Sequence, residues 1–143
     1  MGKLWKKDMS LQDINLFVGK SMVGHLGIEF IEKGQNFLKA TMPVDKRTKQ
    51  PLGILHGGAS VVLAESLGSM ASHMTMEDNH YSVGLEIKAN HIKSVGNGMV
   101  TGKTTPVHLG KTIQIWNIDV KNEKGELVCS SRLTMMILKD LPA

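Results

Sequence analysis

One segment, from Gln50 to Met76, constrains this sequence more than any other. It opens with a Gly-rich turn at Leu55-His56-Gly57-Gly58 and continues with good helix formers from Ala59 to about Met74. At the helical period its apolar side chains cover almost the whole circumference, which is typical of a buried helix. Because the segment is too short to span a bilayer, the sequence predicts a long helix in the core of a globular protein.

Glu65 is the one charged side chain of that helix, because no other Asp, Glu, Lys or Arg lies between Lys49 and Glu77. A carboxylate among apolar residues is costly unless polar groups hydrogen-bond it. Ser69 lies four residues further on, on the same helix face. The pattern fits a functional carboxylate as well as an ordinary solvated Glu, so the helix alone leaves both interpretations open.

The composition indicates one globular domain over residues 1–143, with 41% hydrophobic and 21% charged residues. The net charge of +4 suits an anionic ligand, but the dispersed Lys residues and the single Tyr do not suit nucleic acid. The single cysteine, Cys129, excludes an internal disulfide, and no Cys/His pair has the spacing of a zinc site. No apolar stretch resembles a signal peptide or a membrane span, so we expect a cytoplasmic protein without a membrane partner.

The remaining chain alternates strand patterns with turns. Residues 1–9 are expected to form a flexible or docking arm, followed by a short helix that Ser10 caps and Gly19 ends. Alternating apolar and polar residues predict strands at 28–32, 37–44, 81–93, 99–105, 112–120 and 127–138, the fourth ended by Pro106. Gly96-Asn97-Gly98 is typical of a hairpin turn. This order predicts an α+β fold, a single antiparallel sheet with one helix packed into it.

Several stretches of the chain resemble one family. The segments MPVDKRTKQPLGILHGGASVVLAES, GLEIKANHIKS, PVHLGKTIQIW and CSSRLT are similar to those of the hotdog-fold acyl-CoA thioesterases. More narrowly they resemble the clade of 1,4-dihydroxy-2-naphthoyl-CoA hydrolase and the proofreading thioesterase of enterobactin synthesis. The resemblance runs from about Trp5 to Leu138. Its most specific part is the His56-Gly57-Gly58 turn, with Gln50 six residues before the His and Glu65 nine residues after it.

The resemblance implies a hotdog fold, in which a six-stranded antiparallel sheet wraps around one long central helix. It also implies a homo-oligomer, a dimer of dimers, whose active sites are shared between subunits. Glu65 then matches the catalytic carboxylate, acting as nucleophile or as general base. Gln50 and His56 match the polar residues around the thioester. The Gly57 N–H matches the oxyanion donor, and Ser69 matches a further polar position of the site.

The resemblance also implies where CoA, which is part of the substrate, would bind. The positions that match the CoA-binding segments of the family are Gly84, His91, Ile92, Lys93, Ser94, His108, Leu109, Gly110 and Lys111. Lys side chains and backbone N–H groups of Gly-containing loops suit phosphates, although plain hairpin connections have the same composition. No metal or organic cofactor is required.

Met70 and His73 lie at positions where members of the clade differ, so the acyl group is left open among naphthoyl, benzoyl-type and fatty acids. The prediction is an acyl-CoA thioesterase, for which menaquinone biosynthesis is one candidate pathway. Two alternatives remain. A hotdog dehydratase would use a His and an acid for β-elimination, and a non-catalytic hotdog protein would bind acyl-CoA without turnover. Intact Gln50, His56 and Glu65 favour the hydrolase.

Overall fold

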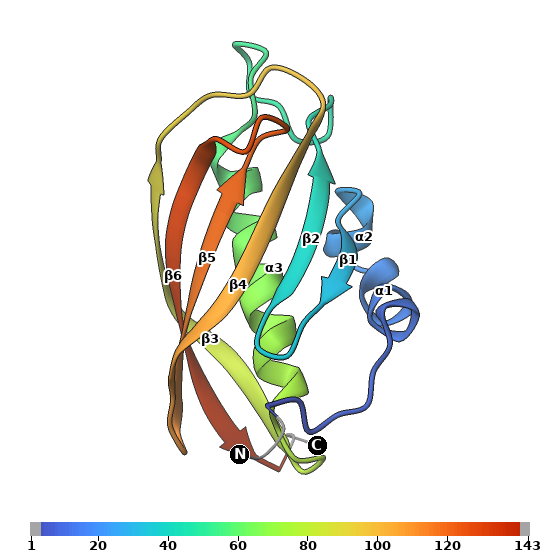
Figure 1. Ribbon diagram of the computed structural model, residues 1–143, viewed down its shortest axis with the longest axis vertical. Helices are drawn as coiled ribbons and strands as arrows, with labels where there is room; N and C mark the ends of the chain where they lie inside the picture. Colours follow the sequence, from blue (N-terminus) through green and yellow to red (C-terminus); the bar gives the residue numbers. More distant parts are fainter. Residues whose placement is uncertain (1–3, 141–143) are drawn as a thin grey trace.

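The long helix predicted from the central segment is α3, Gly57–Met74, and it forms the axis of the molecule in the computed structural model, which describes residues 4–140 (Figure 1). It begins two residues before the predicted start. His56 caps it, because the His56 Nδ1 accepts a hydrogen bond of 2.8 Å from the Gly58 N–H. The His56 cap therefore extends the helix to include Gly57 and Gly58, whereas helix propensity alone would begin it after these two glycines.

Six strands form one sheet around α3: β1 Glu29–Lys33, β2 Leu38–Pro43, β3 His80–His91, β4 Met99–Leu109, β5 Ile113–Lys121 and β6 Leu127–Lys139. All strand pairs are antiparallel, and the order across the sheet is β1-β2-β4-β5-β6-β3. The predicted α+β hotdog fold is thus confirmed, with the sheet curved around the helix (Figure 1). β3 follows α3 directly in the chain, yet it lies at one edge of the sheet.

Two sequence predictions about this part of the chain are wrong. Gly96-Asn97-Gly98 is not a hairpin turn, because β3 pairs with β6 and β4 pairs with β2 and β5. Residues 92–98 instead cross from the sheet edge to its middle. Pro106 does not end β4, which runs on to Leu109. Pro106 falls beside a bulge in the β4–β5 register, where the ladder is interrupted and a missing N–H is tolerated.

The helix sits close to the sheet because two glycines remove side chains at the contact. A Cβ atom at Gly68 would lie 2.5 Å from Leu133 Cδ2, and one at Gly102 would lie 2.5 Å from Leu67 Cδ1. Leu67, Leu133 and Trp116 are almost completely buried in the core between α3 and the sheet. Either glycine could gain a methyl group only if these core side chains moved.

The prediction that α3 is buried on every side is wrong. Half-buried residues form a stripe along it: Val61, Val62, Glu65, Ser66, Ser69 and His73. The stripe mixes Val with Ser, Glu and His, and other Ser residues of the helix are buried. The polarity of the side chains therefore did not separate this face from the buried ones. One face of α3 in the single chain is therefore open rather than covered by the sheet.

Two short helices and an N-terminal arm cover the β1 side of the molecule (Figure 1). In α1, Leu11–Gly19, the predicted Ser10 cap is confirmed as a complete capping box with Asp13. The Asn15 side chain fixes α1 to β1, because its amide bonds both the N–H and the carbonyl of Phe30, at 2.8 and 2.9 Å. The four-residue helix α2, Met22–His25, was not predicted, since one turn is too short to show a period.

The arm docks through Trp5. Its ring stacks on Trp116 at a centroid distance of 6.4 Å, and its indole N–H donates a 2.7 Å hydrogen bond to the Gly34 carbonyl. Lys6 and Lys7 donate backbone hydrogen bonds to the carbonyl of Met74. Residues 4–9 thus lie against the fold, while residues 1–3 of the predicted arm lie outside the described residues. No helix in residues 4–140 is long and apolar enough to cross a membrane.

Candidate active site

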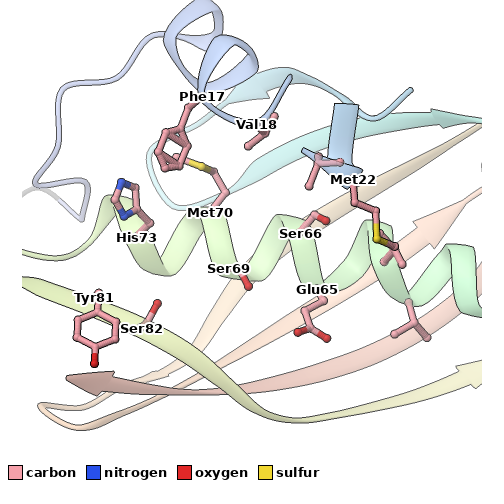
Figure 2. Close-up of a pocket in the computed structure, with 13 residues that line it drawn as sticks. Phe17, Val18, Met22, Glu65, Ser66, Ser69, Met70, His73, Tyr81 and Ser82 are labelled. Atoms are coloured by element: carbon pink, nitrogen blue, oxygen red, sulfur yellow. The ribbon is translucent and has the colours of Figure 1, made fainter. Parts of the chain in front are cut away.

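A cavity of about 530 Å³ lies along the open face of α3 (Figure 2). Its walls come from α1 and α2 on one side and from the beginning of β3 on the other. The α1 and α2 side is apolar and consists of Phe17, Val18, Met22 and Val23. The cavity is therefore a mostly apolar channel with a few polar groups, a form typical of small-molecule sites.

Among residues 4–140, Glu65 is the one acidic residue that lines this cavity. Its carboxylate points toward β3 and lies against the backbone of Gly84, where a Cβ atom would be only 3.1 Å from Oε2. A bulge in the β3–β6 register follows Gly84, between Gly84 and Glu86. Within residues 4–140, no group donates a hydrogen bond to the Glu65 carboxylate, so both oxygens can receive one from a substrate or from water.

Ser69 lies one turn further along α3 and also points toward β3 (Figure 2). Its hydroxyl donates to the sulfur of Met135, with the oxygen 3.9 Å from Sδ. The same sulfur would lie 3.8 Å from a Cβ atom at Gly84. Glu65, Ser69, Gly84 and Met135 therefore form one cluster, in which Gly84 leaves the space beside the carboxylate free.

The far end of the cavity is bounded by Phe17 and His73 (Figure 2). Their rings stack at a centroid distance of 5.2 Å and an interplanar angle of 12°. Burial, and then the positive charge of Lys7, lower the pKa of His73 below its usual value. Met70 lies between Phe17 and the helix and is 4% exposed. Both predicted acyl-site residues, Met70 and His73, line the cavity that holds Glu65.

The predicted oxyanion donor lies at the other end of α3. Gly57 is the first helical residue, so its N–H is at the positive end of the helix dipole. No acceptor for this N–H is present in the described part of the chain, residues 4–140. The His91 ring lies against Gly57, because a Cβ atom at Gly57 would be 2.9 Å from His91 Nε2. Gly57, His91 and the exposed His56 thus form a second polar cluster.

The loop that carries Gln50 belongs to this second cluster. The His56 N–H donates to the Thr48 carbonyl, and Lys49 forms a bridge with Leu55, which folds the loop back on the helix start. The Gln50 Oε1 accepts a hydrogen bond from the Leu52 N–H within the loop. The side-chain carbonyl of Gln50 is thereby used, while its Nε2 has no acceptor among residues 4–140 and remains available as a donor.

The two predicted clusters are separated within one chain. Gly57 and Glu65 are eight residues apart on α3, which places them about 12 Å apart along the helix axis. Because His56 caps the helix and Glu65 faces the cavity, no side-chain rotation brings them together. The structure therefore unites Glu65 with Ser69, Gly84, Met70 and His73, but not with Gln50, His56, Gly57 or His91.

The two predicted CoA segments also lie far apart in space within one subunit. His91–Ser94 follows the end of β3, whereas His108–Lys111 lies beside its beginning, and the twelve residues of β3 span about 36 Å. Lys93 is paired with Glu126, with Nζ and Oε2 2.5 Å apart. Lys111 has no ion-pair partner in the described part of the chain and lines a second cavity of about 490 Å³.

A family profile described as the thioesterase superfamily matches residues 52–129. The chain belongs to this superfamily. The chain is 53% identical, over 94% of its length and 99% of the relative, to the 1,4-dihydroxy-2-naphthoyl-CoA hydrolase of Escherichia coli. It is 48% identical to the proofreading thioesterase EntH of Cronobacter sakazakii, over 94% of this chain and 98% of that protein. The predicted family membership is thus confirmed, and the protein is a thioester hydrolase.

A solved structure supports the fold of this thioesterase directly. The crystal structure of a thioesterase from Haemophilus influenzae superposes with a TM-score of 0.94 at 47% sequence identity. The match covers 97% of each chain. The overall fold of this chain is therefore that of a thioesterase solved by crystallography.

Sequence reasoning did not identify the α1 and α2 side of the cavity. No role was predicted for Phe17, which is 61% exposed in the single chain. The exposure of Phe17 would have been the signal, but exposure is known only once α1 is placed against the rest of the fold. Ser82 was missed for a similar reason, because its place beside the cavity depends on where β3 joins the sheet.

Proposed function

We propose that this protein hydrolyses CoA thioesters of aromatic acids, such as 1,4-dihydroxy-2-naphthoyl or benzoyl-type groups, with fatty acyl groups as secondary substrates. The observation that carries the proposal is the Glu65 carboxylate, which faces a largely apolar cavity beside the open backbone of Gly84. The names of the relatives from Escherichia coli and Cronobacter sakazakii support the same class of reaction. Menaquinone biosynthesis is one pathway in which the naphthoyl substrate would place it.

Each site is proposed to combine two subunits. β3 is an edge strand, which pairs with β6 on one side and with no strand on the other within residues 4–140. Its Val83 and Leu85 are exposed. Pairing of β3 with the β3 of a second copy around a two-fold axis is antiparallel. The His91 end of one copy then meets the His80 end of the other. This arrangement would bring the partner's Gly57, which lies against His91, toward Glu65 beside Gly84.

The proposed chemistry follows from the combined site. The partner subunit's Gly57 N–H, at the positive end of α3, would stabilise the negative charge that develops on the thioester oxygen. The partner subunit's Gln50 would add its free Nε2 donor. Glu65 either attacks the carbonyl carbon itself or takes a proton from the water molecule that attacks it. If Glu65 attacks, an anhydride between Glu65 and the acyl group forms as the C–S bond breaks, and water then hydrolyses this anhydride. If Glu65 acts as base, water adds to the carbonyl and the C–S bond breaks in the same acyl transfer. In both routes the CoA thiolate leaves and takes up a proton, one water molecule is consumed, and the free acid and the Glu65 carboxylate are released.

The same pairing would unite the two CoA segments. The partner subunit's His91–Ser94 would lie near the beginning of this subunit's β3, where Lys111 lines the second cavity with His80 and Gly110. Lys111 would then bind a CoA phosphate as an unpaired cation. Lys93 would first have to give up part of its interaction with Glu126.

The function is tested by incubating the purified protein with a panel of acyl-CoAs and measuring free thiol release. Thiol release from 1,4-dihydroxy-2-naphthoyl-CoA or benzoyl-type CoA is the expected result. Dehydration of a 3-hydroxyacyl-CoA, or hydration of a 2-enoyl-CoA, without thiol release would instead support the dehydratase. Acyl-CoA binding in calorimetry without any turnover would support a non-catalytic protein.

The assembly is tested by sedimentation at assay concentrations. We propose a homotetramer built from two dimers, and every active species should contain at least one dimer. A fully active monomer would contradict the shared site, because Gly57 and Glu65 are eight positions apart on α3 in one chain.

A further inference from the structure

The N-terminal arm, residues 4–9, brings a lysine to the second cavity, and the proposed function leaves this side chain without a role. The cavity, of about 490 Å³, lies at the C-terminal end of α3, where Thr75 lines it. Leu4 and Lys6 of the arm form one wall, and Leu109–Lys111, from the turn between β4 and β5, line the cavity as well. The arm is therefore a wall of this cavity rather than a free tail.

The backbone of the arm is held on both sides of Lys6. Immediately before it, the Trp5 ring stacks on that of Trp116. The backbone N–H groups of Lys6 and Lys7 both donate to the Met74 carbonyl, at 2.8 and 3.1 Å, across the end of α3 (Figure 1). These two donors use both lone pairs of that carbonyl, which lies at the negative end of the helix dipole. The Lys6 backbone is thus fixed, and an anion in the cavity does not meet an unpaired Met74 carbonyl.

The charged side chains that line the second cavity favour an anionic ligand. Within residues 4–140 these are the cations Lys6 and Lys111 and the single carboxylate of Glu77. The Lys6 Nζ lies 3.1 Å from a Glu77 carboxylate oxygen, but the two side chains are 53% and 64% exposed. An ion pair so open to solvent contributes little free energy, so an anion in the cavity can replace Glu77 as the partner of Lys6.

We infer that Lys6 binds a phosphate of the CoA nucleotide together with Lys111, so that the N-terminal arm is part of the substrate site. This inference rests on the proposed function, which places a CoA phosphate at Lys111. A phosphate has several charged acceptor oxygens, so it can bind two lysine ammonium groups at once. The Gly110 N–H donates to the Ile113 carbonyl at 2.9 Å and closes the turn that carries Lys111. Both lysines therefore extend into the cavity from a fixed backbone.

The experiment compares wild type with Lys6→Ala on benzoyl-CoA and on benzoyl-pantetheine, which has the same thioester without the nucleotide and its phosphates. We expect KM for benzoyl-CoA to rise about threefold to tenfold with kcat unchanged, since a phosphate contact is made in the ground state and in the transition state alike. KM for benzoyl-pantetheine should stay within about twofold of the wild-type value. Lys6→Arg keeps the positive charge and should keep KM for benzoyl-CoA near that of wild type.

Lys7→Ala is the matched control, because Lys7 follows Lys6 in the same arm but does not line the cavity, and its Nζ pairs with Asp78. Its KM for benzoyl-CoA should stay within about twofold of wild type. An equal rise for both thioesters in Lys6→Ala, an equal rise in Lys7→Ala, or no rise at all would overturn the inference while leaving the hydrolase assignment intact. Should Lys6→Ala loosen the arm in thermal unfolding, the comparison is made between Lys6→Gln and Lys6→Arg.

A binding measurement separates this inference from the proposed hydrolysis. Calorimetric titration with CoA and with pantetheine needs no turnover. Wild type should bind CoA about threefold to tenfold more tightly than Lys6→Ala does, while the two proteins should bind pantetheine alike. If wild type hydrolyses no thioester but shows this difference for CoA, the proposed function fails and the assignment of Lys6 stands. If the two proteins bind CoA equally, or if wild type binds no CoA, the assignment of Lys6 fails.

Discussion

The two ends of α3 differ in what they offer and in how they are held. At its beginning, His56 and Gly57 are fixed by a cap and by the His91 ring, and they supply donors at the positive end of the dipole. Eight residues later, Glu65 supplies a carboxylate that faces a cavity and has no donor within residues 4–140. Each end has what the other lacks.

If the site is shared as proposed, this difference explains why one helix carries both halves of it without completing either. A rigid helix keeps the proposed acid and the proposed oxyanion donor about 12 Å apart along its axis, so neither half would act alone in one chain. Two helices related by a two-fold axis would complete two sites at once. The separation within the chain is thus the structural reason to expect an obligate dimer as the active unit.

The largest effect is expected from removing the acid of one half. Glu65→Gln keeps the shape of the side chain but cannot act as nucleophile or base, so kcat should fall by about 10²–10⁴ with little change in KM. The fold should persist, because removing a partly buried charge is often neutral or stabilising. Steady-state kinetics and sedimentation check both points. A folded tetramer that keeps kcat within about threefold of wild type would remove Glu65 from the chemistry.

The next test asks whether the two halves act across subunits. Glu65→Gln and the double variant Gln50→Ala/His56→Ala should each be nearly inactive alone. After unfolding and refolding as an equal mixture, about half of the dimers are mixed and each holds one intact site, so about a quarter of wild-type activity should return. Activity no greater than the mean of the two separate variants would show that each chain uses its own residues.

A matched pair of glycine substitutions compares the packing beside Glu65 with the packing at the beginning of α3. In Gly84→Ala the new methyl group presses on the Glu65 carboxylate, and in Gly57→Ala it presses on the His91 ring. We expect each to lower kcat about tenfold by displacing a reacting group, without a matching loss of stability. Thermal unfolding provides the control. His91→Ala should relieve the Gly57→Ala crowding, whereas a loss of folding in either single variant would indicate a purely structural role.

Substitution of the two lysines of the predicted CoA segments should have a smaller effect, and on KM. Lys111→Ala should raise KM about threefold to tenfold, since a phosphate contact is made in the ground state and in the transition state alike. Added salt should produce the same rise by screening. Lys93→Ala should have a weaker effect, because Lys93 is already paired with Glu126. A KM that responds neither to salt nor to Lys111→Ala would place the CoA phosphates elsewhere.

The smallest effect concerns the buried end of the cavity. The pKa of His73 is lowered by burial and by Lys7, so the folded state binds fewer protons than the unfolded state just below the ordinary imidazole pKa of about 6.5. The contribution of the neutral His73 ring to the free energy of unfolding is complete above that pH, and it is lost as the pH falls toward the pKa of His73 in the folded state. His73→Phe should reduce this acid-side loss by less than about 1 kcal/mol, because solvent still reaches the ring. Denaturant unfolding at pH 7.5 and 5 measures it, with His25→Phe as the exposed control.

The sequence was sufficient for the fold where its signals were local or belonged to a family. The lone Glu65, the His56-Gly57 turn and the alternating strands all have short-range signatures. The edge position of β3 has none, because it is decided by pairing with β6 about fifty residues away, and this misled the assignment of Gly96–Gly98 as a hairpin turn. The open face of α3 was also hidden, since its Ser and Val residues do not distinguish a core contact from a cavity wall.

The late position of β6 in the chain has a consequence for how the protein is made. β3 leaves α3 early in synthesis, but its neighbour in the sheet, residues 127–139, is translated last of the described strands. Until then β3 is an unpaired strand that can pair with other nascent chains. The free edge of β3, at which two subunits would share their sites, is therefore in place only once the C-terminal strand β6 has joined the sheet. Each chain must then be fully synthesised and folded before two chains assemble.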